Sequence, residues 1–173
     1  LTVNKKRPDQ REFAPEFTPY GKCLYYQVYD VKELLTEGRN VLQMYVGDGW
    51  YFSSQEGPVM QDRHKEPSVV IQMELTYEDG TSEMILSDGS EACRTDFIVY
   101  SDLYQGEKQD LTLASGEKKP VMIKDYGYDF LHVQPMEPIL PIREIPAVEV
   151  FTSPAGETIV DFGQVLAGRA RIR

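Results

Sequence analysis

The segment GDGWYF, residues 47–52, holds the single tryptophan of the chain beside an acid and two further aromatic rings. An exposed ring can stack against the apolar face of a sugar, and a carboxylate can accept hydrogen bonds from the sugar's hydroxyl groups. The segment therefore predicts a carbohydrate-binding site made of Asp48, Trp50 and Tyr51. The alternative is that Trp50 closes a corner of the hydrophobic core, since tryptophan is highly buried on average.

A second, weaker candidate is the segment SDLYQGE, residues 101–107. It places the carboxylates of Asp102 and Glu107 on either side of the ring of Tyr104, which repeats the combination of acid and ring. The alternative here is a hydrogen-bonded loop that holds the edge of a sheet, because polar groups in folded chains usually find a nearby partner.

No group of residues indicates catalysis. His64 and His132 are isolated in the sequence, with no metal-ligand spacing and no nucleophile motif beside them. Acids are abundant, but most of them lie in turns or alternate along strand patterns, and nothing selects one pair as acid and base. We therefore predict no catalytic residue and no cofactor. Acidic loops could supply oxygen ligands to calcium, but no EF-hand spacing assigns the ligands.

The charge balance excludes two kinds of partner. The chain has 28 acidic and 18 Lys or Arg residues, which gives a formal net charge of −10. Such a chain repels phosphate backbones and anionic lipid, and no apolar stretch approaches the roughly 20 residues of a spanning helix. We therefore expect neither nucleic acid nor membrane as a partner. Cys23 and Cys93 fit two buried thiols or one disulfide, so a cytoplasmic and a secreted location both stay open.

The elements that must position these residues are mostly short strands. Residues 31–35 are too short for an independent helix and predict one helical turn. The apolar run 41–46, just before GDGWYF, predicts a strand buried on both faces. Residues 68–89 predict a hairpin whose Asp79-Gly80 pair favours a type I′ turn. Further strands are expected at 23–31, 96–104, 110–113, 120–125 and 130–135. The pattern indicates an all-β fold of the sandwich type.

The composition changes after residue 133. Residues 134–147 contain Pro135, Pro138, Pro141 and Pro146, which predict an extended, proline-rich connector because proline removes a ladder donor. Residues 148–173 resume strand patterning around a Pro-Ala-Gly turn, but 26 residues are too few for a domain. The expected organisation is a β-sandwich at 1–133, the connector at 134–147, and the first strands of a second, truncated β domain at 148–173.

The order of several short motifs resembles the N-terminal region of bacterial α-L-rhamnosidases. That family has a VNG-K turn, LAPGWT, YxTYDVTDLL and GDGWY, which resemble VNKK, FAPEFT, YYQVYDVKELL and GDGWY in this chain. Further on, YEDG, SDLYQGE, QPMEP and DFGQVLAG resemble the family's YEDG hairpin, SDxYDGE segment, QPMPP connector and DFGQNxAG opening. Each motif is modest alone, but the set is collinear over essentially the whole chain.

Three departures from the family pattern involve aromatic rings. Glu16-Phe17 replaces Gly-Trp, Glu91-Ala92 follows the serine where the family has Trp, and Arg169 replaces the Trp after Ala-Gly. We therefore expect ring stacking to be lost at these three places and Trp50 to be the surviving stacking ring. Gln105 also replaces an Asp.

The resemblance implies a jelly-roll-like antiparallel β-sandwich that accompanies a catalytic (α/α)6 barrel. The family removes terminal α-L-rhamnose with two glutamates of that barrel, and no part of this chain resembles it. This chain alone is therefore expected to be inactive, with rhamnose-containing glycans and the remaining domains of the parent enzyme as partners. Two hypotheses follow: an accessory region that binds the sugar, assisted by calcium in some relatives, or a scaffold without a ligand that packs against the barrel.

Overall fold

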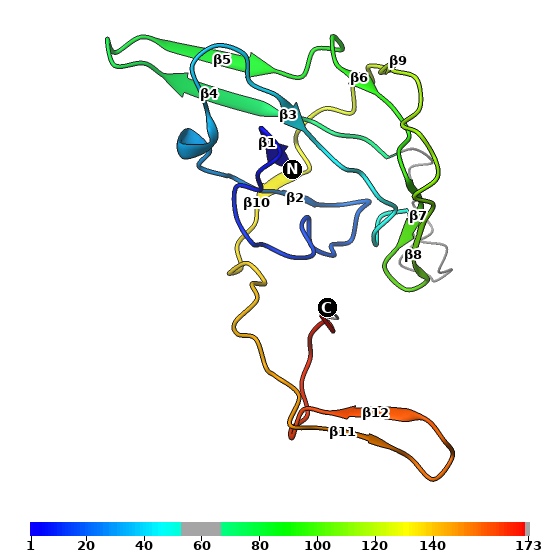
Figure 1. Cartoon of the computed structure of the whole chain (residues 1–173). Coiled ribbons are helices and arrows are strands. Elements are labelled where there is room, and N and C mark those ends of the chain that lie inside the picture. The colour runs from blue at the N-terminus through cyan, green and yellow to red at the C-terminus, as the bar shows by residue number, and fades with distance from the viewer. Residues whose placement is uncertain (53–66, 172–173) are drawn as a thin grey trace.

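The computed structural model describes residues 1–52 and 67–171. The elements within these residues are short β-strands and one 3-10 turn (Figure 1). They are β1 (Thr2–Val3), β2 (Leu24–Tyr26), η1 (Lys32–Leu34), β3 (Leu42–Gln43), β4 (Gln72–Thr76), β5 (Ser82–Leu86), β6 (Ala92–Cys93), β7 (Ile98–Asp102), β8 (Gly106–Gln109), β9 (Lys119–Pro120), β10 (Leu131–Val133), β11 (Glu149–Thr152) and β12 (Thr158–Asp161). The all-β prediction is confirmed. His64 lies outside the described residues.

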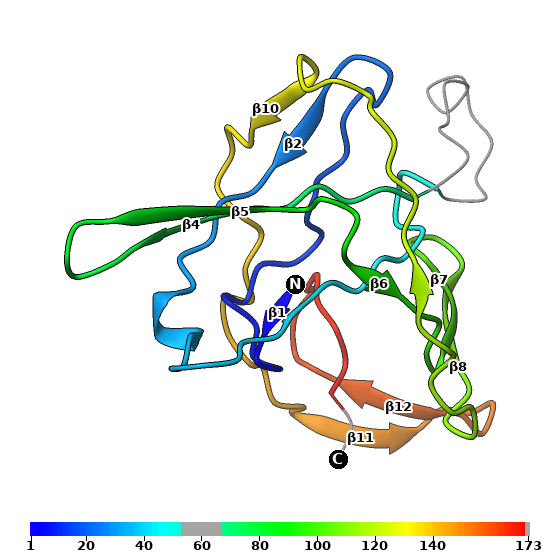
Figure 2. The same ribbon diagram turned by 90° about the horizontal axis from the view of Figure 1, so that it is seen from above.

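The strands pair two by two. β1–β3, β4–β5, β6–β9, β7–β8 and β11–β12 are antiparallel, whereas β2 and β10 run parallel, with Leu24 opposite Leu131. Figure 2 shows these pairs spread around the molecule. Because the described pairs do not join into larger sheets, they leave jelly-roll connectivity as a prediction.

The β4–β5 hairpin is confirmed, but its turn differs from the one expected. Tyr77 N–H donates to Thr81 O at 2.9 Å, and Gly80 N–H donates to Tyr77 O at 3.0 Å. Only Gly80, with φ +83°, has a positive φ in this turn. The loop is therefore a three-residue connection with glycine in the left-handed position, and the type I′ assignment was wrong. The Asp79 carboxylate accepts the N–H of Thr81 at 2.9 Å, which fixes the turn locally.

Several other predicted strands are shorter or absent in the structure. β2 covers only three residues of the predicted strand 23–31, and β3 only two of 41–46. Residues 110–113 form a turn closed by the bond from Leu113 N to Asp110 O, and β9 ends at Pro120, where the predicted strand 120–125 begins. The single helical turn is confirmed as η1. Alternating side chains indicate which face of a strand is buried, but they do not indicate which segment pairs with it. These segments lack long pairing partners, so their strands are short or absent.

The described residues form a small core. Val3 is the one buried apolar residue among them, 1% exposed, whereas Tyr45 and Val46 are 55% and 51% exposed. The predicted burial of 41–46 on both faces was therefore wrong. The accessible surface of the chain is 14518 Å², whereas a folded monomer of 19.8 kDa has about 8,600 Å². The small sheets thus leave much apolar surface uncovered by this chain.

The proline-rich segment contains no strand and leads to the β11–β12 hairpin, which lies apart from the other strands in Figure 1. The proline-rich segment contacts the first loop at two places: the Gln134 side chain donates to Glu16 Oε1 at 2.8 Å, and Glu12 N–H donates to Ile139 O at 2.9 Å in an isolated bridge. The Glu12 carboxylate also pairs with the guanidinium of Arg169, so the last described residues return to the start of the chain.

The structure bears on three further expectations. Cys23, partly exposed, and Cys93, exposed, are both free thiols, so the structure has neither the disulfide nor the pair of buried thiols that the sequence left open. Residues 1–52 and 67–171 include no helix that is long and apolar enough to cross a membrane. Within the same residues, no three side chains of His, Cys, Asp or Glu gather in a way that could hold a metal ion.

Candidate functional site

The loop that carries Trp50 is anchored on the end of β7. Asp48 N–H donates to Ser101 O at 2.8 Å, and Gly49 forms an isolated parallel bridge with Asp102. Glycine at position 47 suits this approach, because a Cβ there would lie 3.0 Å from Ser101 Oγ and that side chain would have to shift. The two segments that the sequence singled out, 47–52 and 101–107, are therefore neighbours in the fold.

Five aromatic side chains form what we call the ring cluster: Phe13, Phe17, Tyr20, Trp50 and Tyr51. The Trp50 ring centroid lies 5.8 Å from that of Phe13 and 6.3 Å from that of Phe17. Phe17 meets Tyr20 edge-on at 5.5 Å, and Tyr20 meets Tyr51 edge-on at 5.2 Å. Such tilted and edge-on contacts are the favoured geometries of aromatic pairs.

Trp50 is half-buried in this cluster, so the structure has neither an isolated tryptophan platform nor a fully buried core residue. The more exposed rings are its neighbours Phe13 and Phe17, which are 45% and 43% exposed. A ligand would therefore meet the two phenylalanines together with one part of the indole.

Of the three predicted carboxylates, Asp48 and Asp102 have different surroundings. Burial raises the pKa of Asp48, and the nearby carboxylate of Asp102 raises it further. Asp102 is buried, 5% exposed, and its Oδ1 accepts the N–H groups of Tyr104 at 2.8 Å and Gln105 at 2.9 Å. Asp102 therefore stabilises its own turn, which agrees with the alternative of a hydrogen-bonded loop for this segment. Asp48 is the more exposed hydrogen-bond acceptor of the two.

Two more tyrosines surround the ring cluster. Burial raises the pKa of Tyr20 to about 12, with further contributions from Tyr104 and Tyr51. Burial also raises the pKa of Tyr51, with a further contribution from Tyr126. These electrostatic interactions place Tyr104 and Tyr126 close to the cluster, and Tyr104 is 58% exposed.

Glu107 differs from the other predicted site residues. It lies on β8 opposite Ser101, it is exposed, and its carboxylate accepts a hydrogen bond from the side chain of Gln109. The structure thus brings together Asp48, Trp50, Tyr51, Asp102 and Tyr104, and it gives Glu107 contacts with its own hairpin.

The sequence analysis missed three rings of the cluster: Phe13, Phe17 and Tyr20. The signal that could have found them is their spacing in FAPEFTPY, which presents three rings within eight residues. The ring counted as lost at position 17 is present, because Phe17 itself supplies one, and it contacts both Trp50 and Tyr20.

The other two departures also have contacts of their own. The Arg169 guanidinium lies 5.9 Å from the Phe13 ring centroid, a cation–π distance. The Glu91 carboxylate accepts the N–H groups of Asp88 at 3.2 Å and Gly89 at 2.9 Å, and so closes that turn. Neither residue supplies a ring, so a lost ring at these two positions stays the expectation.

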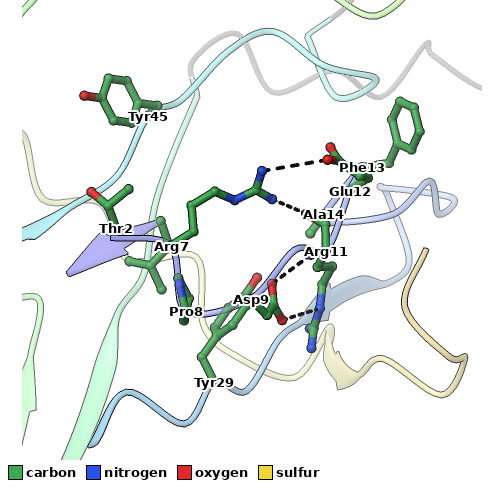
Figure 3. A pocket seen from close by; sticks show the side chains of 11 residues that line it. Thr2, Arg7, Pro8, Asp9, Arg11, Glu12, Phe13, Ala14, Tyr29 and Tyr45 are labelled. Atoms are coloured by element: carbon green, nitrogen blue, oxygen red, sulfur yellow. Dashed lines mark hydrogen bonds and ion pairs between the residues drawn. The ribbon is translucent and has the colours of Figure 1, made fainter. Parts of the chain in front are cut away.

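A polar pocket of about 310 Å³ adjoins the ring cluster and shares Phe13 with it (Figure 3). Arg7 and Arg11 enter it from the first loop, together with Asp9 and Glu12, and Tyr29 and Tyr45 line it from neighbouring segments. This pocket is, beside the ring cluster, a second place where the described residues gather groups able to contact a small ligand.

The fold of paired short strands and loop-borne rings defines an all-β domain of the sandwich type. The family model described as the alpha-L-rhamnosidase N-terminal domain matches residues 1–149. The chain therefore belongs to the family of α-L-rhamnosidase N-terminal domains.

The relatives agree with this assignment. An α-L-rhamnosidase of Streptomyces avermitilis is 30% identical over 99% of this chain and 18% of its own length. One from Formosa agariphila is 29% identical over 98% of this chain and 19% of its own. The crystal structure of the Streptomyces avermitilis enzyme complexed with L-rhamnose superposes with a TM-score of 0.72 at 30% identity, over 94% of this chain and 17% of that one. The chain thus spans about a fifth of the length of these relatives.

Proposed function

We propose that this chain is a non-catalytic accessory region of an α-L-rhamnosidase, and that its ring cluster binds a rhamnosyl unit of the substrate. The observation that carries the proposal is the convergence of three separate segments, 13–20, 48–51 and 102–104, on one aromatic surface with a carboxylate beside it. Hydrolysis of the rhamnoside would belong to other parts of a longer enzyme, since the relatives are about five times as long.

The chemistry of the cluster suits a deoxy sugar. A rhamnose ring has apolar C–H faces and a methyl group, which gain from contact with the exposed edges of Phe13 and Phe17. The Asp48 carboxylate can accept a hydrogen bond from a hydroxyl group, and Tyr104 can both donate and accept one. Asp102 would act indirectly, by holding the turn that positions Tyr104.

A second candidate function is that of a scaffold without a ligand. Trp50 packs between two phenylalanines, as a structural corner would. The β4–β5 hairpin also leaves Met84, Ile85 and Leu86 46%, 44% and 56% exposed. Apolar surface of this kind suits contact with the remaining domains of the parent enzyme.

The experiment that separates the two functions is a titration of this chain with L-rhamnose, followed by Trp50 fluorescence and by calorimetry. Each titration is run with calcium and with a chelator. The test variant is Trp50→Ala, and Tyr77→Ala in the β4–β5 turn is the aromatic control, since Tyr77 is exposed and belongs to another hairpin. Circular dichroism verifies that both variants fold.

Saturable heat with a fluorescence shift in the wild type and in Tyr77→Ala, but no heat in Trp50→Ala, supports sugar binding at the ring cluster. A dissociation constant of ~1 mM corresponds to about 4 kcal/mol, which a few ring contacts and hydrogen bonds can supply. No heat and no fluorescence shift at a sugar concentration tenfold above ~1 mM would contradict sugar binding and leave the scaffold function. A calcium requirement would show as heat that the chelator abolishes.

A further inference from the structure

The pocket beside the ring cluster is built by one short loop and two tyrosines. Arg7 Nη2 donates to Arg11 O, and the Arg11 guanidinium lies 4.8 Å from the Tyr29 ring centroid. Arg11 and Glu12 are largely buried, with 17% and 22% of their side-chain surfaces exposed. Arg7 is therefore held by a backbone carbonyl and Arg11 by a ring, and the side chains of Arg11 and Glu12 do not project freely into solvent (Figure 3).

The charges of this pocket balance in pairs. Arg11 Nε lies 3.2 Å from Asp9 Oδ2, and Arg7 Nη1 lies 3.8 Å from Glu12 Oε1. The two guanidinium groups and two carboxylates that line the pocket sum to zero charge, and the Glu12 carboxylate also pairs with Arg169 from the end of the chain. An anion would be repelled by the two carboxylates beside the guanidinium groups, in a chain whose net charge is −10.

Paired guanidinium and carboxylate groups suit a ligand with neighbouring hydroxyl groups better than they suit an anion. Each hydroxyl of a sugar both donates and accepts, so it can accept from an arginine N–H and donate to the adjacent carboxylate. Hydrogen bonds to charged groups are the stronger kind, and an arginine fork can contact two adjacent oxygens. Arg7, whose side chain is 53% exposed, is the group best placed to make this contact.

We propose that this pocket is a second saccharide site, which binds the hydroxyl groups of one neutral sugar residue. Its volume, about 310 Å³, lies at the lower end of the range for small-molecule sites and fits one ring rather than a chain. The site goes beyond the proposed function, because it uses polar pairs where the ring cluster uses aromatic faces. Phe13 belongs to both, so the two sites adjoin.

The test is protein-observed NMR on the full 173-residue chain labelled with ¹⁵N. The Nε–Hε signals of Arg7 and Arg11 report the pocket, and the indole N–H signal of Trp50 reports the ring cluster. The probes are methyl α-L-rhamnopyranoside, which is neutral, and D-glucuronate, which is anionic. Arg7→Lys keeps the charge and removes the fork, and Arg94→Lys is the control, since Arg94 pairs with Asp96 at 3.8 Å outside this pocket.

We expect the neutral sugar to shift the Arg7 and Arg11 signals saturably, and Arg7→Lys to weaken this binding roughly tenfold while Arg94→Lys does not. The proposal is overturned by unmoved arginine signals, by tighter binding of glucuronate than of the neutral sugar, or by an unchanged affinity in Arg7→Lys. If the Trp50 signal moves alone, the ring cluster binds sugar and this pocket does not. If the arginine signals move alone, the pocket holds and sugar binding at the ring cluster fails.

Discussion

The ring of Phe17 meets the indole of Trp50 edge-on, with 6.3 Å between the ring centroids. Phe17 comes from the first loop and Trp50 from the loop after β3, so this contact joins two segments that share no strand pairing in the described residues. The contact therefore contributes to stability as well as to any ligand surface. A loss of binding on changing either residue has to be separated from a loss of folding.

We expect Trp50→Ala to lower the free energy of unfolding by about 2 kcal/mol, less than the roughly 3–5 kcal/mol of a fully buried tryptophan, because Trp50 is half-buried. A double-mutant cycle with Phe17→Ala should give a coupling of about 0.5–1.5 kcal/mol. Urea denaturation of the four proteins measures it. Strict additivity would contradict a direct contact between the two rings.

The second prediction concerns Asp102, which supplies a structural carboxylate. Asp102→Ala removes the acceptor of two backbone N–H groups, and we expect a loss of about 2 kcal/mol from the free energy of unfolding. Asp102→Asn keeps an oxygen at the same place and should lose much less. The comparison by urea denaturation tests whether the oxygen or the charge matters, and equal losses in the two variants would contradict the turn-building role.

The same Asp102→Asn variant should change the titration of Asp48. Burial and the Asp102 carboxylate raise the pKa of Asp48 in the folded state, so removing that charge should lower it. A raised carboxyl pKa favours folding below the pKa of the unfolded chain, and this contribution is lost as the pH rises through the folded pKa. The Asp102→Asn variant should therefore lose less free energy of unfolding than the wild type as the pH rises through the pKa of Asp48. Carbon NMR titration of the Asp48 carboxyl measures the shift.

The fourth prediction concerns pH and Tyr20. Burial raises the pKa of Tyr20 to about 12, above its ordinary value of 10.0. The unfolded chain then loses the tyrosine proton at a lower pH than the folded chain, so Tyr20 supports folding fully below pH 10.0 and ceases to do so as the pH rises through about 12. Tyr20→Phe should flatten this part of the stability curve. Denaturation across that range measures it, and an unchanged slope in the variant would contradict the shift.

The sequence predicted two hairpins and one helical turn of the fold, but not the turn type of the first hairpin or the extent of most other strands. The β4–β5 and β11–β12 hairpins were predictable because alternation and a glycine turn lie within a few consecutive residues. The single turn at η1 was predictable for the same reason. The parallel pairing of β2 with β10 was not, because it joins segments more than a hundred residues apart and depends on the rest of the fold.

The candidate site was predictable only in part. Asp48, Trp50 and Tyr51 could be selected because acid and rings are adjacent in one loop. Phe13 and Phe17 could not, since their contacts with Trp50 are tertiary and the comparison with the family motif treated position 17 as a lost ring. Asp102 was selected for its charge, but its burial and its two backbone partners come from the turn geometry.

The last prediction concerns Glu12, which connects the first loop with the end of the chain. Its backbone N–H bonds to Ile139, its carboxylate pairs with Arg169, and Arg169 in turn lies over Phe13. We expect Glu12→Gln to leave the backbone bridge intact and to loosen residues 148–171, seen as faster hydrogen exchange in β11 and β12. Exposed ion pairs contribute roughly 0.2–1 kcal/mol, so the global free energy of unfolding should change little.

The control is Arg171→Gln, which breaks the more exposed pair between Arg171 and Glu144 and touches neither Glu12 nor Phe13. Exchange in β11 and β12 should rise in Glu12→Gln and in Arg169→Gln, and the double variant should add little to either, because both remove one interaction. An equal rise in Arg171→Gln would mean that charge loss alone loosens the segment. The Glu12–Arg169 pair would then have no specific role in holding the β11–β12 hairpin against the first loop.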